Sequence, residues 1–94
     1  LVLDSDDISA WNNLGSIYED MNDFARAEAI YKRAQSLNPY RAETNYNLAR
    51  IQLLQHQKDL SEDMKQDIIR RLNFVLSVNP HNKGAERLLA GLTK

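Results

Sequence analysis

The sequence predicts an all-α protein made of antiparallel helix pairs stacked on one another, and three observations support this fold class. First, apolar residues recur at the i, i+3, i+7 spacing of one helix face, as in Trp11, Leu14 and Tyr18. Second, glycine and alanine stand among the large residues, which allows two helices to interlock closely. Third, an apolar residue followed by Asn-Pro occurs twice, at residues 37–39 and 78–80.

The first helix pair is predicted within residues 8–39. Gly15 stands in the middle of its first helix, where the absence of a side chain allows a neighbouring helix to come close. Asn22 then breaks the pattern, since asparagine is one of the few non-glycine residues that adopt the left-handed conformation at helix ends. The second helix ends at Pro39, and its inward face carries Ala27, Tyr31 and Ala34. We expect four aromatic residues in the core: Trp11, Tyr18, Phe24 and Tyr31.

A second, longer pair is predicted downstream, because Pro80 follows Pro39 by 41 residues instead of the 34-residue period of the first repeat. The seven extra residues are expected around the turn, where about one added turn in each helix would keep both apolar faces in register. The first helix of this pair should reach about Leu54. The second should begin near Ser61 or Glu62, where a capping serine precedes acidic residues. A final short helix after Pro80 should cover the open side of this pair.

The order and spacing of the first pair closely resemble one tetratricopeptide repeat: Trp11-x-x-Leu14-Gly15-x-x-Tyr18, then Ala27-x-x-x-Tyr31, Ala34 and Pro39. The resemblance implies a right-handed superhelical stack of antiparallel helix pairs, a TPR-like α-solenoid. The second pair departs from the signature, with Asn45, Ala49 and Gln52 at the places of Trp11, Gly15 and Tyr18. Residues 1–94 are then expected to form a single domain that is part of a longer chain. Its expected parts are the tail of a preceding repeat (1–7), a standard repeat (8–41), a repeat with longer helices (42–82) and a closing helix (83–94).

Composition argues against several classes of function. A net charge of −1 predicts no attraction to nucleic acid or membranes, and no apolar run is long enough to insert into a bilayer. Without cysteine there is no thiolate metal site and no thiol nucleophile. His56 and His81 lack a second ligand at helical spacing, and the three glycines form no phosphate-binding loop. We therefore expect no enzyme activity, no metal and no cofactor. Whether the protein is cytoplasmic or periplasmic stays open.

The resemblance also implies a concave groove lined by the first helix of each pair. Its expected residues are Ser9, Asn12, Ser16, Glu19 and Asp20, then Glu43, Tyr46, Asn47 and Arg50, then Arg87. Tyr46 and Arg50 are four residues apart on one helix face, so an aromatic ring and a forked donor are available to hold a peptide carboxylate or carbonyl. Acidic residues at one end and arginines at the other predict a bipolar groove. The alternative is a plain solvated face.

The function that follows from the resemblance is a protein–protein interaction module of a scaffold or assembly protein. It would bind an extended peptide or a helix in the groove. A clamp for acidic chaperone C-termini is disfavoured, because only Asn47 matches among the five positions that such clamps use: Asn12, Ser16, Asn47, Gly84 and Leu88. The alternative is a structural spacer or a weak homo-oligomer that stacks through exposed ends, at residues 1–3 and at Leu88 and Leu92. The identity of the partner, the organism and the pathway stay open.

Overall fold

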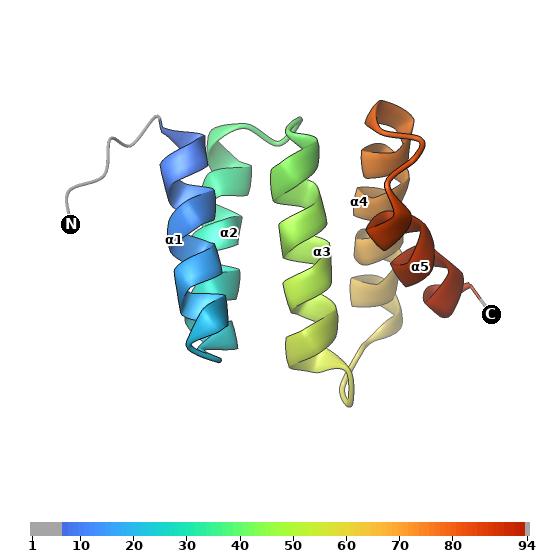
Figure 1. Cartoon of the computed structure of the whole chain (residues 1–94). Coiled ribbons are helices and arrows are strands. Elements are labelled where there is room, and N and C mark those ends of the chain that lie inside the picture. Colours follow the sequence, from blue (N-terminus) through green and yellow to red (C-terminus); the bar gives the residue numbers. More distant parts are fainter. Residues whose placement is uncertain (1–6, 94) are drawn as a thin grey trace.

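A computed structural model describes residues 7–93, and this part of the chain folds into five α-helices. They are α1 (Ile8–Asp20), α2 (Phe24–Leu37), α3 (Ala42–His56), α4 (Glu62–Val78) and α5 (Lys83–Leu92). Figure 1 shows two layers, with α1, α3 and α5 in one and α2 and α4 behind them. Each helix packs against its neighbours in sequence. The all-α fold of a helical repeat, predicted from the sequence, is confirmed.

The first helix pair is held by capping residues and by one close approach. Asp7 caps α1 by accepting a hydrogen bond from the amide of Ala10 at 3.0 Å, and Asp23 caps α2 in the same way. Between them Asn22 has a φ of 61°, the left-handed conformation predicted for it. In the middle of α1, a Cβ built on Gly15 would lie 2.4 Å from Cε1 of Tyr31. The two helices therefore meet at a point where only glycine fits.

The second pair is longer in both helices and in the turn. α3 has 15 residues against 13 in α1, and α4 has 17 against 14 in α2. The connection at residues 57–61 is two residues longer than the one at residues 21–23. The extra residues thus add somewhat less than a full turn to each helix. α4 begins at Glu62, where Ser61 accepts a hydrogen bond from the amide of Met64 at 3.1 Å.

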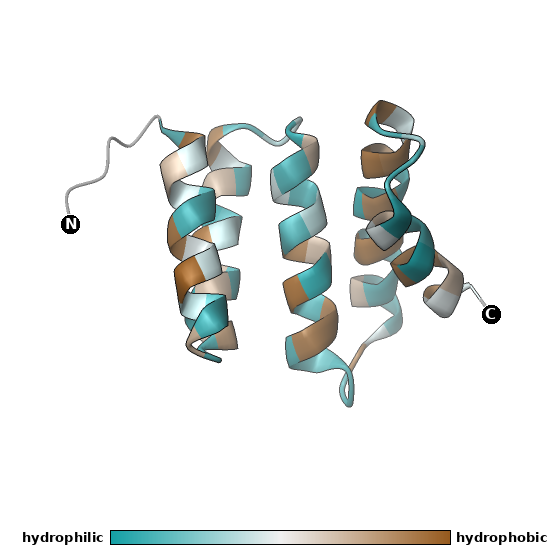
Figure 2. Ribbon diagram, in the orientation of Figure 1, coloured by the Kyte–Doolittle hydropathy of each residue, from teal (hydrophilic) through white to brown (hydrophobic). Residues whose placement is uncertain are grey.

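Two clusters of buried residues form the core, and α3 contributes to both. On one side, Leu48 and Ile51 of α3 pack with Ala27 and Tyr31 of α2. On the other side, the cluster contains Ala49, Ile68, Leu72, Val75 and Ala85, from α3, α4 and α5. Figure 2 accordingly shows hydrophobic ribbon on α4 and the lower part of α3, whereas the α2–α3 and α4–α5 connections are hydrophilic. Because α3 is covered on both sides, it joins the two helix pairs into one packed unit.

The aromatic residues expected in the core are buried to different extents. Tyr31 is fully buried, and Tyr18 and Phe24 pack against its cluster while partly exposed. Trp11 is only half-buried, and its indole Nε1 is shielded from solvent without a hydrogen-bond partner among the described residues. Of the four expected core residues, Tyr31 is therefore fully buried in the structure of residues 7–93, and the other three are partly buried.

The last helix closes the second pair. Ala85 of α5 is fully buried, and Leu88, Leu89 and Leu92 are half-buried against the same cluster. Leu88 and Leu92 therefore do not form the outward apolar stripe expected for self-association. The apolar residues 1–3, the other expected stacking surface, lie outside the described residues. Within residues 7–93, no helix has the length and apolar character needed to cross a bilayer.

Candidate functional site

The first helices of the two pairs carry matching stripes of accessible side chains. On α3 the stripe is Glu43, Asn47, Arg50 and Leu54, which share one face because they are spaced i, i+4, i+7 and i+11. Glu43 and Leu54 are exposed, and Asn47 and Arg50 are half-buried. Thirty-four residues earlier, α1 carries Ser9, Asn13, Ser16 and Asp20, all exposed. We call these eight residues the stripe face; six of them belong to the predicted groove.

Asn12, by contrast, does not face a groove. It is 2% exposed, and its side-chain amide donates a hydrogen bond to the Thr44 hydroxyl at 2.9 Å. The bond joins α1 to α3 across 32 residues of sequence. The prediction that Asn12 contacts a ligand is therefore corrected, because its donor is used inside the protein to hold one helix pair against the next.

Tyr46 stands one repeat period after Asn12 and also lies at a junction. It is half-buried and packs against the cluster around Leu72. A Cβ built on Gly84 would lie 2.3 Å from the Tyr46 hydroxyl, so the ring of α3 comes against the backbone of α5. Arg87 is the third residue at this position, and it is exposed on α5. The position just after the signature tryptophan is thus a contact with the following first helix: Asn12 of α1 contacts α3, and Tyr46 of α3 contacts α5.

Arg50 and Glu19 form an ion pair between α3 and α1. Both terminal nitrogens of Arg50 donate to the two carboxylate oxygens of Glu19, with Nη2 at 2.9 Å from Oε1. The Tyr31 hydroxyl donates to Glu19 Oε1 at 3.0 Å, and Asn47 Oδ1 lies 3.4 Å from Arg50 Nη2. The Tyr46 ring centroid lies 5.8 Å from the Arg50 guanidinium carbon. A bidentate, partly buried pair of this kind orients both side chains.

The surroundings of this pair change two proton equilibria. Burial, together with the hydrogen bond and the negative charge of Glu19, raises the pKa of the Tyr31 phenol. Burial alone would lower the pKa of the Arg50 guanidinium, but Glu19 raises it above its usual value. Arg50 is therefore firmly charged, and Tyr31 keeps its proton as the donor to Glu19.

The structure does not show the predicted separation of acidic residues and arginines at opposite ends of the groove. Glu19 and Arg50 were expected at opposite ends, yet they neutralise each other across the α1–α3 junction. The exposed charges left on the stripe face are acidic: Asp20 at the end of α1 and Glu43 at the start of α3. A ligand carboxylate would have to displace Glu19 from Arg50.

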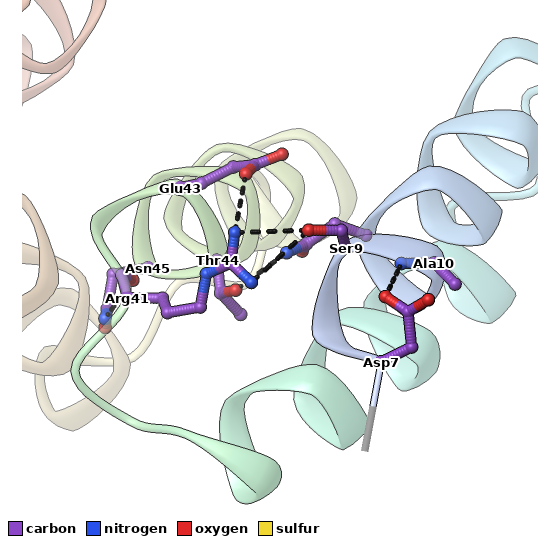
Figure 3. A network of polar contacts seen from close by, with 8 residues as sticks. Asp7, Ser9, Ala10, Arg41, Glu43, Thr44 and Asn45 are labelled. Carbon is purple, nitrogen blue, oxygen red and sulfur yellow. Dashed lines mark hydrogen bonds and ion pairs between the residues drawn. The ribbon is translucent and has the colours of Figure 1, made fainter. Parts of the chain in front are cut away.

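Arg41 connects two stripe-face residues, Ser9 and Glu43, and the sequence did not predict this contact. Figure 3 shows its guanidinium directed at the Ser9 hydroxyl and at Glu43, with contacts of 3.4 Å to each. The same view shows Thr44 beneath, at the place that Ala10 holds one repeat earlier. The 34-residue alignment could have indicated this contact, because it places Thr44 and Arg41 where the first repeat has Ala10 and Asp7.

A second polar cluster joins α2 to the end of α3. Glu28 is 6% exposed and accepts from Gln55 Nε2 at 2.8 Å and from Lys32 Nζ at 3.0 Å, while His56 Nε2 lies 2.9 Å from it. His56 was expected in the turn between helices, but it lies in the last turn of α3. No group of three or more metal-binding side chains occurs within residues 7–93. The cluster is thus most simply a structural contact between the helix pairs.

Two antiparallel helix pairs of one pattern, packed through shared interfaces, define a helical repeat protein. Residues 8–41 match the model of the tetratricopeptide repeat family, and this match supports the assignment of the first helix pair to a repeat of that family. The resemblance inferred from the sequence is thereby confirmed. No curated protein sequence matches the chain significantly. Repeats of this family generally mediate protein–protein interactions and are typically not catalytic.

Proposed function

We propose that this protein is an interaction module of a scaffold or assembly protein that binds a peptide segment or a helix across the stripe face. The observation that carries the proposal is the exposure of Leu54, an apolar side chain that is 43% exposed within an otherwise polar stripe. An isolated apolar contact bordered by polar groups is the usual arrangement of a small recognition surface.

The chemistry of the bound segment follows from the charges around Leu54. α1 and α3 run in the same direction, so Asp20 and Leu54, which end their stripes, lie at the same end of the face (Figure 1). Because Glu19 already neutralises Arg50, the accessible charge that the stripe face itself carries at this end is that of Asp20. The segment is therefore expected to bring an apolar side chain to Leu54 and a lysine or arginine toward Asp20.

The experiment is selection of a displayed random peptide library against the protein. Peptides that combine an apolar residue with a basic residue are expected. Leu54→Glu should weaken their binding at least tenfold, because loss of an apolar anchor contact costs about 1–2 kcal/mol. Asp20→Lys should act in the same direction through the charge.

Arg33→Glu is the matched control. Arg33 is exposed on α2, in the layer behind the stripe face, and no ion pair of its side chain is found within residues 7–93. It is a better control than Lys32, which pairs with Glu28. If the selected peptides bind Leu54→Glu normally and lose binding to Arg33→Glu, the protein uses the opposite layer and the proposed site is wrong.

A further inference from the structure

Arg71, in the middle of α4, is a half-buried arginine that the protein leaves unpaired. Its Nε is shielded from solvent without a hydrogen-bond partner, and no side-chain hydrogen bond or ion pair of Arg71 occurs in the part of the chain that the structure describes. The charges of Asp67 and Glu28 act on its guanidinium. However, Asp67 is paired with Arg70, and Glu28 is paired with Lys32. The accessible terminal nitrogens of Arg71 are therefore free to donate to a group from outside the chain.

An unpaired cation at this depth does not stabilise the fold. Burial lowers the pKa of the Arg71 guanidinium, while the charges of Asp67 and Glu28 act in the opposite direction. Buried polar groups in native proteins almost always have hydrogen-bond partners. The repeat pattern does not require an arginine either, because the equivalent position of the first pair, 41 residues earlier, holds Ile30. Arg71 thus costs the isolated chain free energy that a bound acidic group would offset.

Two apolar side chains continue the row that Arg71 begins on α4. Phe74 and Val78 follow at i+3 and i+7, so the three residues share one face of the helix. Phe74 is half-buried and Val78 is 53% exposed, and neither packs against the two core clusters of the described residues. Because the charge of Glu28 acts on Arg71, this face is turned toward α2. We call Arg71, Phe74 and Val78 the α4 face.

We propose that the α4 face is a second interaction surface, which binds a peptide segment that combines an acidic residue with apolar residues. The free guanidinium fits a carboxylate, which it can hold by two parallel hydrogen bonds. The apolar residues of the segment pack on Phe74 and Val78, at the helical spacing typical of peptide recognition along a helix. This charge preference is opposite to that of the stripe face, where Asp20 favours a basic segment.

The two surfaces belong to different layers of the protein. Figure 1 shows α4 behind α3, whereas the stripe face is formed by α1 and α3. Binding at the α4 face therefore does not depend on binding at the stripe face. A protein with both surfaces can hold a basic segment and an acidic segment, which suits a scaffold.

The test is selection of a displayed random peptide library on Leu54→Glu, the variant in which the stripe face has lost its apolar contact. We expect peptides that combine an acidic residue with apolar residues. Their affinity should fall at least tenfold when Arg71→Gln is added, and Val78→Ser should also weaken them. The inference is overturned if no peptide binds, if the selected peptides carry no acidic residue, or if they bind Arg71→Gln with unchanged affinity.

Arg33→Gln is the matched control for charge. Arg33 is exposed on α2, in the same layer as α4, and it has no ion pair within residues 7–93. Its replacement removes the same charge but leaves the α4 face intact, so the affinity should stay within about twofold. If Arg33→Gln abolishes binding and Arg71→Gln does not, the α4 face is not the site.

Arg71→Met tests whether Arg71 has a structural role instead. Because the guanidinium has no internal partner, an apolar side chain of similar length should leave the thermal midpoint at or above that of the parent. The same variant should lose the selected peptides. A midpoint lower by about 4 °C or more would mean that Arg71 stabilises the fold through contacts within the chain, and the inference would be wrong.

Discussion

The contact between Gly15 and Tyr31 leaves no room for a side chain at position 15. The Tyr31 ring is fully buried, and its hydroxyl is bonded to Glu19, so the ring cannot turn away from an added methyl group. A Cβ at position 15 would come within 3.0 Å of three ring atoms. This close approach, rather than conformational freedom, accounts for the glycine.

Gly15→Ala should therefore destabilise the protein even though alanine is the better helix former. Overpacking costs about 1–3 kcal/mol, whereas the gain in helix propensity is at most about 1 kcal/mol. A thermal midpoint lower by about 4–8 °C per kcal/mol is expected in calorimetry. Gly91→Ala in α5 is the control, because nothing lies within 4 Å of a Cβ there. Equal midpoints for the two variants would contradict this account of the packing.

Tyr31 should make the stability of the protein fall at alkaline pH. Its folded pKa is raised by burial and by Glu19, while a tyrosine in the unfolded chain titrates near pH 10. Above that pH the unfolded chain releases a proton that the folded chain keeps. The contribution of the protonated Tyr31 to the free energy of unfolding is complete below about pH 10. Above that pH it decreases by up to about 1.4 kcal/mol per pH unit.

The measurement is denaturant unfolding at a series of pH values from about 8 to 11. Tyr31→Phe should have a flatter alkaline profile than the parent, whereas Tyr40→Phe, at a residue that is 78% exposed, should keep the parental slope. If both variants keep that slope, another group causes the alkaline loss.

At the residue scale, the sequence predicted the close approach at Gly15 and the left-handed conformation of Asn22, but not the burial of Asn12 or the pairing of Glu19 with Arg50. The first two follow from backbone geometry, which is local. The others depend on which side chain of the next pair lies opposite. That depends on the angle between pairs, and periodicity within a single helix does not contain it.

At the scale of helices, capping explains why α4 begins where the sequence predicted. Ser61 accepts from the Met64 amide, and Glu62 and Asp63 follow in the first turn, where acidic groups favour the helix dipole. α3 has no side-chain cap, since Arg41 stands at its N-cap position. α3 also ends at His56, two residues later than predicted, because the polar Gln55 and His56 are typical of a turn. They stay helical because Glu28 provides a buried partner for both.

Ser61→Ala should lower the stability by about 1 kcal/mol, within the usual range of about 0.5–2 kcal/mol for a lost N-cap. Ser77→Ala is the same substitution near the other end of α4, where the exposed hydroxyl donates to the carbonyl of Phe74. That change should stay within about 0.5 kcal/mol of the parent. Urea unfolding curves compare the two. A larger loss for Ser77→Ala than for Ser61→Ala would show that capping does not determine the start of α4.

At the scale of the whole molecule, α3 couples the two cores. Its Leu48 and Ile51 belong to one cluster and its Ala49 to the other, and the Glu19–Arg50 pair and the Asn12–Thr44 bond cross the same junction. In stacked repeats, stability is approximately the sum of each unit and its interfaces with its neighbours. A junction with both apolar and polar contacts should make the two helix pairs unfold together.

Leu72→Ala tests this coupling from a distance. Leu72 is fully buried in the α3–α4–α5 cluster, so its truncation should cost about 2–5 kcal/mol of the roughly 5–15 kcal/mol that such a domain has. Trp11 is the single tryptophan and lies in α1, so its fluorescence reports on the first pair, whereas circular dichroism reports on all helices. Both signals should shift to lower denaturant by the same amount, because loss of the second pair exposes the face of α2 that covers α3.

Leu54→Ala, at an exposed leucine of α3, should shift neither signal appreciably. A fluorescence transition that stays at its parental midpoint while the circular dichroism becomes biphasic would mean that the first pair is stable alone and that α3 does not couple the cores.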